Sequence, residues 1–401
     1  MKIVEIGTGY TCIPAQIGAA TEIVVEELTR SLLHKGYDVT IMDIKDKNRV
    51  ATNLPITEVY MPQFFSSTDT SLGIVHKLKR VIYSISLTYK IHQFIKNNPN
   101  QDIFLHFHNQ YNLFFFLKLT SKSFRERVKI GYTVHSHIWF GKWENIKNTI
   151  KKRYFQEVYS FQHADKVFVL NDIVASMLKE QYNISSNKII LVINGVNTDI
   201  YTGCENDFKE IERIKQIYKL QNKHVILQVG SVCERKNQLG TLQLLAPIIQ
   251  KDKRIVFMYV GGIIDEHYKQ QIDDYIISEK LGKNVVYMGE VSPGKTLNKL
   301  YTIAHCAIMN SQSEAFALVI AEALSARRPI FINQNIIQSL PFLKNNVGNG
   351  ILKIKDSFKD DLYHLLTNDN YYRDMQNKGR ELIQNEYSWD ASANIYIQKF
   401  K

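Results

Sequence analysis

The amino-acid sequence predicts an α/β protein of two domains, each with a doubly wound parallel sheet flanked by helices. Two observations carry this prediction. Short apolar segments typical of buried strands alternate with longer amphipathic segments along the whole chain, which is the pattern of βαβ units. The length of 401 residues also exceeds one ordinary hydrophobic core, so we expect two domains.

The order of the elements locates the two domains. The pattern predicts a first series of strands at residues 2–6, 39–44, 103–107, 129–134, 166–170 and 189–193, with a helix at 21–35. It restarts with strands at 224–230, 255–260, 285–288, 307–309 and 330–333 and helices at 239–250 and 318–325. A turn-forming segment from Asn194 separates the two series. We therefore predict domains at 1–197 and 198–385, and a C-terminal helix within 386–401 that returns to the first domain.

The composition limits the class of protein. Apolar residues make up 45% and charged residues 22% of the chain, which is typical of a globular protein. The four cysteines form no Cys-x-x-Cys pair, which argues against a zinc site or a disulfide framework and indicates a reducing compartment. The first residues, with an acid at Glu5, predict a strand and no signal peptide, and no apolar run approaches the ~18 residues of a membrane span. We expect a cytoplasmic protein.

The net charge of +11 favours an anionic partner such as a nucleotide phosphate or an anionic lipid surface. Nucleic acid has only this net charge in its favour, without a recognised motif, and is not expected as a partner. The segment 70–101 contains no acid, and the apolar residues Leu78, Val81, Ile82 and Ile85 recur in it at helical spacing. Two interpretations remain open: a helix on an anionic membrane, or a core-packed helix with a solvated basic face.

Two glutamates in the second half of the chain form the most informative motif for function. Glu314 follows the strand 307–309, and Glu322 lies eight residues later, inside the helix that begins there. A helix N-terminus offers free N–H groups to a pyrophosphate, and a carboxylate accepts hydrogen bonds from a sugar diol. Spacing alone favours an ordinary first-turn acid at Glu314 and a solvated helix acid at Glu322, because acidic residues are common in first turns.

This Glu-x7-Glu segment resembles the signature of the retaining glycosyltransferases of the GT-B fold, the large family-four group. The resemblance implies that Glu314 contacts the donor sugar near the reacting centre and that Glu322 binds the ribose. It also implies that backbone amides between them hold the diphosphate and sugar, namely those of Phe316, Ala317, Leu318 and Val319.

Further segments follow the order of the same family. The loop from Gly230 resembles the one that donates basic residues to the pyrophosphate, with Lys236 matching the family's lysine. Ser231 replaces the usual arginine, so Arg235 is expected to supply the second positive charge. The segment around Gly18 resembles the glycine-rich loop beside the donor. After Glu322, the family's glycine is missing from the segment Ala326-Arg327-Arg328-Pro329.

Histidines end two strands of the first domain. His135 matches the family's histidine that touches the donor sugar or the acceptor, and the resemblance assigns it a catalytic role. His106 and His108 resemble the family's Asp-x-x-His-x-His run. The sequence has no His-x3-His pair and no Asp-x-Asp, so we expect no metal and no cofactor. In the segment 138–150, Trp139, Phe140 and Trp143 could stack on a sugar or fill a core.

The predicted activity is transfer of a sugar, hexosyl or N-acetylhexosaminyl, from a UDP- or GDP-type nucleotide sugar to a glycan or lipid-linked acceptor. Members of this family commonly build cell-surface polysaccharides, so the resemblance implies an enzyme of that synthesis that is peripheral to the membrane. A nucleotide-sugar epimerase and a non-catalytic partner of the same fold remain alternatives. An NAD-dependent dehydrogenase is disfavoured, because Cys12 stands where the Gly7-Thr-Gly9 segment would need its third glycine.

Overall fold

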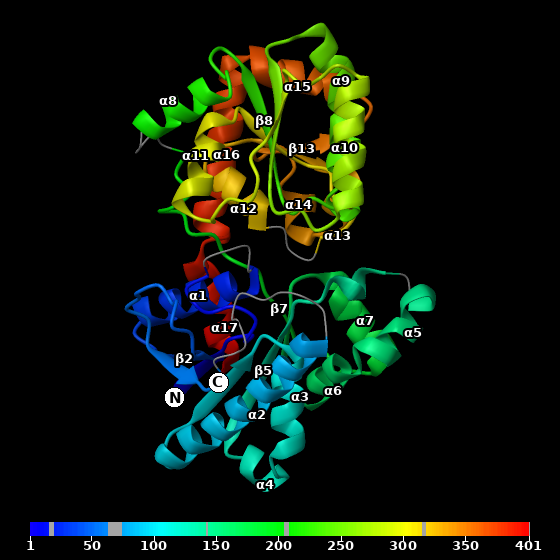
Figure 1. The fold of residues 1–401 in the computed structure, drawn as a ribbon. Helices are drawn as coiled ribbons and strands as arrows, with labels where there is room; N and C mark the ends of the chain where they lie inside the picture. Colours follow the sequence, from blue (N-terminus) through cyan, green and yellow to red (C-terminus); the bar gives the residue numbers. More distant parts are fainter. Residues whose placement is uncertain (16–19, 63–73, 142, 204–207, 315–317, 401) are drawn as a thin grey trace. The chain divides into compact units, whose positions relative to one another are not determined.

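The computed structural model describes residues 1–15, 20–62, 74–141, 143–203, 208–314 and 318–400, and it divides the chain into two compact units (Figure 1). Unit 1 comprises Met1–Gly195 and Trp389–Lys401, and unit 2 comprises Val196–Ser388. The division lies two residues before the boundary expected after residue 197. The C-terminal helix α17 (Trp389–Phe400) belongs to unit 1 and packs on α1.

Unit 1 is built on a seven-stranded parallel sheet of order β3-β2-β1-β4-β5-β6-β7. Its strands are β1 (Lys2–Ile6), β2 (Asp38–Ile44), β3 (Ile56–Val59), β4 (Ile103–Phe107), β5 (Val128–Val134), β6 (Lys166–Val169) and β7 (Ile189–Leu191). Its helices besides α17 are α1 (Ala20–His34), α2 (Ile74–Asn97), α3 (Gln110–Leu119), α4 (Lys122–Arg125), α5 (Trp143–Arg153), α6 (Phe155–His163) and α7 (Asp172–Tyr182), with a short 3-10 turn η1 (His137–Phe140).

Unit 2 is built on a six-stranded parallel sheet of order β10-β9-β8-β11-β12-β13. Its strands are β8 (His224–Val229), β9 (Ile255–Val260), β10 (Val285–Tyr287), β11 (Cys306–Met309), β12 (Ile330–Asn333) and β13 (Ile351–Ile354). The helices are α8 (Phe208–Ile217), α9 (Gln238–Lys251), α10 (Glu266–Ser278), α11 (Lys295–Ile303), α12 (Leu318–Ser325), α13 (Gln334–Ser339), α14 (Pro341–Asn345), α15 (Phe358–Thr367) and α16 (Asp369–Glu386), with η2 (Glu234–Lys236).

Burial on both faces explains why the central strands are mostly apolar. Every residue of β4 and of β9 is buried, because helices cover both faces of a parallel sheet. The strand order reverses between β1 and β4 in unit 1 and between β8 and β11 in unit 2. Ligands of doubly wound sheets bind outside the carboxyl ends of the strands at such reversals. The fold therefore directs attention to the loops after these four strands.

The acid-free segment 70–101 includes α2. Two of its basic residues contact protein, in contrast to the solvated basic face that one interpretation predicts. Tyr83, Leu87 and Ile91 are buried in the core of unit 1, so this helix is core-packed on one side. Lys79 is also buried, with its Nζ donating to the Tyr10 carbonyl oxygen at 3.4 Å. The Arg80 guanidinium lies 4.7 Å from the Tyr10 ring centre, so both cations contact protein.

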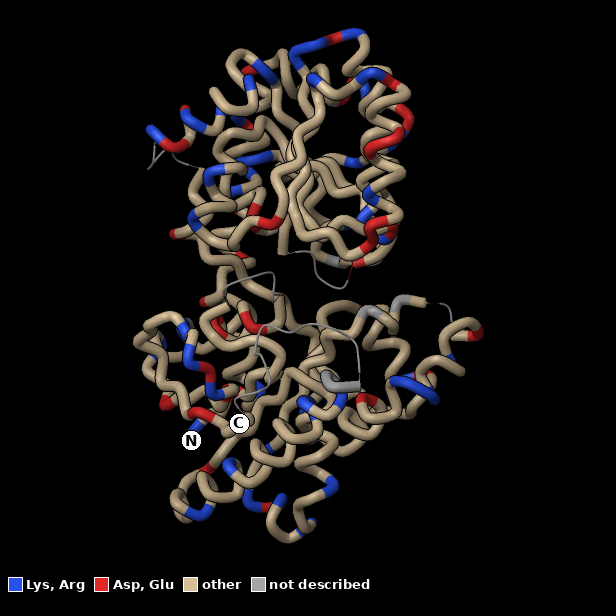
Figure 2. Tube along the Cα trace, in the orientation of Figure 1, with Lys and Arg blue, Asp and Glu red and all other residues tan. Residues whose placement is uncertain are grey.

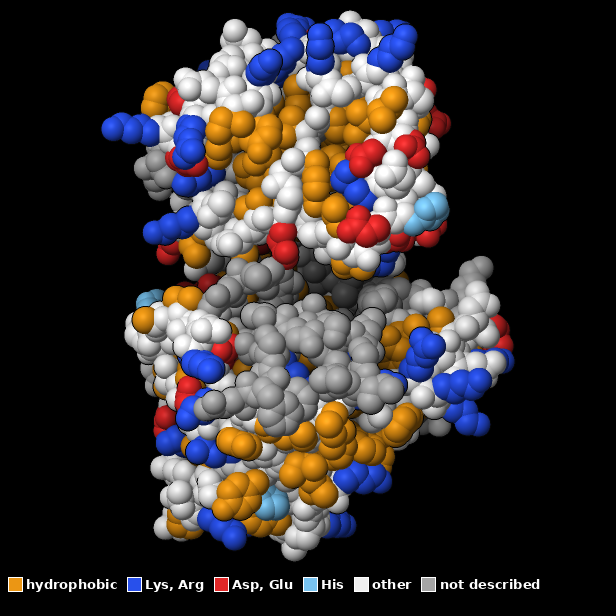
Figure 3. Space-filling view, in the orientation of Figure 1, with side chains coloured by type: hydrophobic (Ala, Val, Ile, Leu, Met, Phe, Trp, Pro, Cys, Tyr) orange, Lys and Arg blue, Asp and Glu red, His pale blue; other side chains and the backbone are white. Residues whose placement is uncertain are grey.

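The opposite side of α2 exposes apolar residues. Leu78 is 53%, Ile85 48% and Tyr89 64% exposed, while Lys77 and Lys96 are exposed cations. Figure 2 shows basic positions along α2, and Figure 3 shows apolar side chains gathered over the region of α2 and α3. Among the described residues, no helix combines the length and apolarity needed to cross a membrane.

The aromatic segment 138–150 contributes mainly to the core. Trp139 is fully buried and donates from Nε1 to Glu157 at 3.1 Å, so it fills the core and does not present a stacking face. Trp143 packs on the same core and lines a separate cavity of about 680 Å³ formed by α3, α5, α6 and the end of α7. The side chain of Phe140 lies outside the described residues.

Candidate functional site

Two loops of unit 2 meet at the reversal of its strand order. The loop after β8 contains η2, and the loop after β11 leads to α12. The Gln312 amide donates to the Arg235 carbonyl oxygen at 2.8 Å, and Asn237 Nδ2 donates to the Asn310 carbonyl oxygen at 3.1 Å. Asn237 adopts a left-handed conformation, with φ of 56°, and its side chain caps α9 by accepting from the Gly240 amide. These hydrogen bonds join the two loops into one continuous surface.

Glu314 forms the centre of this surface. Its side chain is only 8% exposed and accepts a hydrogen bond from Lys236 Nζ at 2.7 Å, while Arg235 lies 3.3 Å from its other oxygen. Burial alone would raise the pKa of Glu314, but Lys236, Arg235 and a hydrogen bond from Ser311 together outweigh burial, and the pKa is lowered. Arg235 also donates to the Ser313 carbonyl oxygen at 2.9 Å. The site therefore holds an ionised carboxylate between two cations.

Glycines allow the strands beneath this surface to approach closely. A Cβ at Gly261 would lie 2.2 Å from the Gly230 carbonyl oxygen, and a Cβ at Gly230 would lie 3.2 Å from the Lys236 side chain. Gln238 Nε2 donates to the carbonyl oxygens of Gly230 and Ser231, at 3.3 and 3.0 Å. The backbone around Ser231 is thus fixed, in the place where the family pattern has an arginine.

Glu322 lies one to two turns into α12 and contacts tyrosine. The Tyr301 hydroxyl donates to Glu322 at 3.1 Å. Burial raises the pKa of Glu322 to about 6, although hydrogen bonds from Tyr201 and Tyr301 oppose that rise. Tyr201 also accepts from the Gly294 amide through its hydroxyl, at 3.0 Å. The two tyrosines have no counterpart among the residues expected from the sequence, because no local motif marks them.

The helix start expected to hold a diphosphate is described in part. Leu318 and Val319 are the first residues of α12 and are partly buried. Phe316 and Ala317 lie outside the described residues, as does Gly18 in unit 1. The structure therefore brings Arg235, Lys236, Glu314, Ser231, Leu318, Val319 and Glu322 into the loops and helix at one end of the unit 2 sheet.

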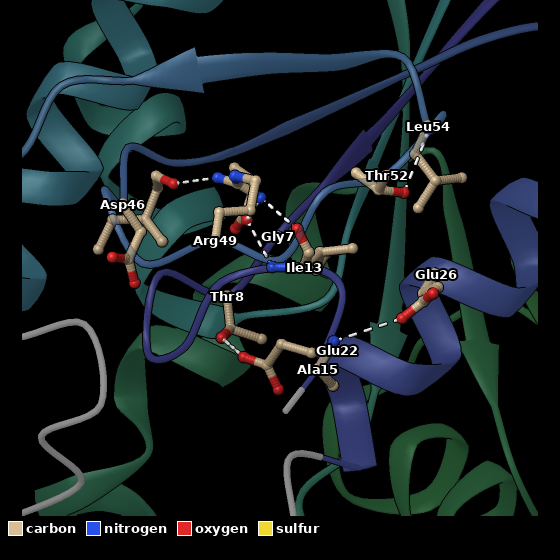
Figure 4. Close-up of polar contacts among 12 residues, drawn as sticks. Gly7, Thr8, Ile13, Ala15, Glu22, Glu26, Asp46, Arg49, Thr52 and Leu54 are labelled. Carbon is tan, nitrogen blue, oxygen red and sulfur yellow. Dashed lines mark hydrogen bonds and ion pairs between the residues drawn. The ribbon is translucent and has the colours of Figure 1, made fainter. Parts of the chain in front are cut away.

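In unit 1, the loop after β1 is held by buried polar groups (Figure 4). The buried Glu22 of α1 accepts a short hydrogen bond from the Thr8 hydroxyl, and Glu26 accepts from the Ala15 amide at 3.3 Å. Arg49 donates to the Ile13 carbonyl oxygen and points toward this loop in Figure 4. These contacts fix the chain on both sides of the expected glycine-rich segment.

Close packing around Gly7 and Gly9 explains why both residues are glycines, without a bound dinucleotide. A Cβ at Gly7 would lie 2.5 Å from Asp43 Oδ1. Gly9 has φ of 79°, and a Cβ there would lie 2.3 Å from the Tyr83 ring. Asp43 is fully buried and pairs with Arg49 at 2.8 Å, and burial raises its pKa to about 6.

The histidines at the ends of β4 and β5 form one cluster with Glu5. Glu5 and His106 are paired across β1 and β4, and the His106 ring nitrogen Nδ1 lies 2.9 Å from Glu5 Oε2. His108 Nε2 lies 2.8 Å from the same oxygen, and His108 Nδ1 lies 3.1 Å from His135 Nε2. Burial alone would raise the pKa of Glu5, but the adjacent His106 and His108 imidazoles together lower it to about 2.

Burial favours the neutral forms of His108 and His135. Burial lowers the pKa of His108 to about 4 and the pKa of His135 well below its ordinary value, and neighbouring imidazoles add to both shifts. His106 and His108 are buried, whereas His135 is partly exposed. His135 is thus the member of the cluster that can reach a substrate.

Three cavities lie away from the residues expected to form the site. The largest, about 1270 Å³, opens at the amino ends of the unit 1 strands near Asp38, Asp102 and Asp165. Another, about 570 Å³, lies in unit 2 between His224, His305 and Arg328, and the third is the 680 Å³ cavity beside Trp143. None of the three is lined by a predicted site residue.

The fold is that of the GT-B glycosyltransferases. The structure resembles sucrose-phosphate synthase from Thermosynechococcus elongatus, with a TM-score of 0.74 and 17% identity over 100% of this chain and 99% of that one. It also resembles HepE from Anabaena in complex with UDP-glucose, with a TM-score of 0.70 and 12% identity over 100% and 99% of the two chains. At such low identity these similarities establish the fold alone.

The sequence establishes the family. Residues 21–200 match the model of Glycosyltransferase Family 4, and residues 209–382 match that of Glycosyl transferases group 1. The chain belongs to this family of glycosyltransferases.

Individual relatives are distant and matched over part of their length. An uncharacterized glycosyltransferase of Methanocaldococcus jannaschii is 22% identical over 67% of this chain and 74% of its own. The alpha-galactosylglucosyldiacylglycerol synthase of Streptococcus pneumoniae is 24% identical over 64% of this chain and 65% of its own. The O-antigen chain mannosyltransferase RfbU of Salmonella typhimurium is 24% identical over 51% of each chain.

Proposed function

We propose that this glycosyltransferase transfers a hexosyl or N-acetylhexosaminyl group from a UDP- or GDP-type nucleotide sugar to a glycan or lipid-linked acceptor and retains the anomeric configuration. The observation that carries this proposal is the Glu314 carboxylate held between Lys236 and Arg235, directly before α12. The cations and the helix N-terminus provide the positive field that a diphosphate requires.

The proposed mechanism assigns one task to each group. The bond between the anomeric carbon and the diphosphate oxygen breaks, while a hydroxyl oxygen of the acceptor bonds to the same face of that carbon. The hydroxyl proton passes to the departing diphosphate, so charge and atoms balance. Lys236 and Arg235 stabilise the negative charge that builds on the diphosphate, without a metal. Glu314 orients the sugar, and Glu322 accepts hydrogen bonds from the ribose.

The relatives support the class of substrate. HepE was crystallised with UDP-glucose, the pneumococcal relative is named a glycolipid synthase, and RfbU is named an O-antigen chain mannosyltransferase. Nucleotide sugars as donors and lipid-linked or polysaccharide chains as acceptors are therefore the first substrates to test, together with a role in cell-surface polysaccharide synthesis.

The test combines product analysis with a variant. UDP-glucose, UDP-galactose, UDP-N-acetylglucosamine and GDP-mannose are each incubated with a diacylglycerol glycolipid and with a polyprenyl-linked sugar. We expect acceptor-dependent nucleotide release and a product of unchanged anomeric configuration by NMR. Glu314→Gln should lower turnover by ~10²–10³, with nucleotide affinity retained, because it removes a group that acts at the reacting centre.

A matched control changes an exposed acid of the same unit, Glu381→Gln on α16, which should leave turnover unchanged. Epimerised or free sugar formed without an acceptor would favour the nucleotide-sugar epimerase instead. Turnover of Glu314→Gln within a few-fold of the wild type would remove Glu314 from the proposed role.

We also propose that α2 seats the protein on anionic membrane from the cytoplasmic side. The exposed apolar residues Leu78, Ile85 and Tyr89 recur along one side of the helix beside Lys77. Each basic residue near an anionic bilayer contributes ~1 kcal/mol. Flotation with phosphatidylglycerol vesicles tests this: Leu78→Gln/Ile85→Gln should reduce binding, and Ile217→Gln, which changes an exposed residue of α8, should not. Equal flotation of both variants would contradict the proposal.

A further inference from the structure

The Glu5–His108–His135 chain of hydrogen bonds has only one consistent assignment of protons. An ionised carboxylate can accept hydrogen bonds but cannot donate one. The Glu5 carboxylate is fully buried and lies 2.8 Å from His108 Nε2, so this nitrogen must carry the hydrogen. A neutral imidazole carries one hydrogen only, which leaves His108 Nδ1 as an acceptor.

The proton position on His108 determines the proton position on His135. His108 Nδ1 and His135 Nε2 are 3.1 Å apart, and one of them must donate. Because His108 Nδ1 is the acceptor, His135 Nε2 is the donor. A neutral His135 then has no hydrogen on Nδ1, and that atom can accept a hydrogen bond from a substrate hydroxyl. The buried carboxylate thereby determines which nitrogen of a partly exposed imidazole is basic.

Buried and aromatic residues shield this chain of hydrogen bonds from water. His106 Nδ1 donates to Glu5 and lies 2.9 and 3.1 Å from its two oxygens, and His106 Nε2 lies 2.8 Å from the buried Thr133 hydroxyl. The Tyr396 and Phe400 rings of α17 lie 5.2 and 6.0 Å from the His106 ring. The C-terminal helix thus covers the cluster with aromatic rings, and hydrogen bonds in such a dry environment are strong.

A metal ion is a less suitable explanation for the same residues. The ligand atoms of Glu5, His106 and His108 all lie within 4.8 Å of one another. On a tetrahedral zinc ion, however, neighbouring ligand atoms lie about 3.4 Å apart. The observed carboxylate–imidazole distances of 2.8 and 2.9 Å are instead those of direct hydrogen bonds.

We propose that Glu5 acts through His108 as a positioning residue that holds His135 in its Nε2–H form, with Nδ1 presented as the acceptor for a hydroxyl of the sugar substrate. The catalytic consequence depends on the proposed glycosyl transfer, whereas the position of the proton does not. Glu5 and His108 touch no substrate in this account.

The position of the proton is measured directly by NMR. Protein labelled with ¹⁵N in its histidine rings is recorded in a long-range ¹H–¹⁵N correlation, with His135 assigned from the spectrum of His135→Gln. We expect His135 in the wild type to show a protonated Nε2 and an unprotonated Nδ1. Protonation on Nδ1 overturns the proposal without reference to any activity.

The variant Glu5→Gln tests the source of this preference. A glutamine can donate to His108 Nε2, so the Nε2–H form of His135 should cease to dominate. In sugar transfer, Glu5→Gln should lower kcat by about 10- to 100-fold and change KM for the nucleotide sugar less than threefold, as expected for a partner that orients a functional imidazole. Glu126→Gln, an exposed acid before β5, is the matched control and should change neither measurement.

Three results would overturn the proposal: an unchanged His135 proton in folded Glu5→Gln, unchanged transfer by that variant, or one equivalent of metal whose removal alters the His106 and His108 signals. If Glu5→Gln does not fold, the wild-type spectrum alone decides the proton assignment. If the wild type transfers no sugar, the proposed function fails while the proton assignment is still decided by NMR.

Discussion

Lys236 Nζ lies 2.7 Å from the carboxylate of Glu314, although the two residues are 78 positions apart in the sequence. They come from the loops after β8 and β11, the two strands at which the order of the unit 2 sheet reverses. The pair joins the basic loop after β8 to the acidic loop after β11, and it makes the ionisation of Glu314 depend on Lys236.

The variant Lys236→Met should lower turnover by ~10²–10³, because it removes a cation that stabilises the leaving diphosphate. It should also move the acid limb of the pH–rate profile to higher pH. Lys236 lowers the pKa of Glu314, and without it burial raises that pKa, so the carboxylate protonates at a less acidic pH. Lys251→Met, at the exposed end of α9, is the control. An unshifted acid limb would contradict the coupling.

The variant Arg327→Gly should be more stable than Arg327→Ala. Arg327 has φ of 57° just after α12, where its amide donates to the Leu324 carbonyl oxygen. A left-handed conformation strains any residue with a Cβ, and glycine relieves this at the end of a helix. Arg327→Ala loses the same hydrogen bond to Asn377 but keeps the Cβ. We expect the glycine variant to be about 0.5–1 kcal/mol more stable than the alanine variant in thermal unfolding; equal midpoints would contradict this.

The variant Arg49→Met should destabilise unit 1 by about 3–5 kcal/mol in urea unfolding at pH 8, because it leaves the buried Asp43 carboxylate without its cation. Arg49→Met/Asp43→Asn should recover much of this loss, since an amide needs no counter-charge. The loss should be smaller at pH 5, where Asp43, with a pKa near 6, is largely protonated. A double variant no more stable than the single one would show that Arg49 acts mainly through the Ile13 and Ile44 carbonyl oxygens.

Glu157 should make the stability of unit 1 depend on pH. Burial raises its pKa to about 7, although hydrogen bonds from Ser136, Tyr132 and Trp139 oppose that rise. The native state therefore binds this proton more tightly than the unfolded chain, so the contribution of Glu157 is present below pH ~4.5 and is lost as the pH rises through 7. Glu157→Gln cannot titrate, so relative to the wild type it should gain about 2–3 kcal/mol between pH 4.5 and pH 8.

Urea unfolding at both pH values measures this gain, and Glu144→Gln, an exposed acid on α5, supplies the control. A difference between Glu157→Gln and the wild type that does not change with pH would mean that Glu157 has the same pKa in the folded and unfolded chain.

The sequence predicted the buried strands well, because a parallel sheet covered on both faces leaves continuous apolar segments. The bounds of β4, β9 and α12 agree with the expected ones to the residue. The strands β3 and β13 were not predicted. Both are four-residue strands at the sheet edges, where partly exposed residues interrupt the apolar pattern.

Contacts between residues far apart in the sequence limited how much of the site could be predicted. The motif order placed Glu314, Lys236 and His135 on the correct loops, but Glu5 appeared only as an acid in the first strand. Its contact with His106 depends on the pairing of β1 with β4 across about a hundred residues. Tyr301 is similarly brought to Glu322 by packing of α11, and no spacing in the sequence marks such a contact.

The central claim is that unit 2 holds the diphosphate of a nucleotide sugar through Lys236, Arg235 and the start of α12. The most direct measurement is the thermal stabilisation of the protein by UDP, GDP and ADP, each with excess EDTA and then with magnesium. We predict that one nucleotide stabilises the wild type by about 2.7 kcal/mol at a hundredfold excess over Kd. The effect should be unchanged by EDTA and lost in Lys236→Met/Arg235→Met. Stabilisation by none of the three, or only with magnesium, would contradict the account.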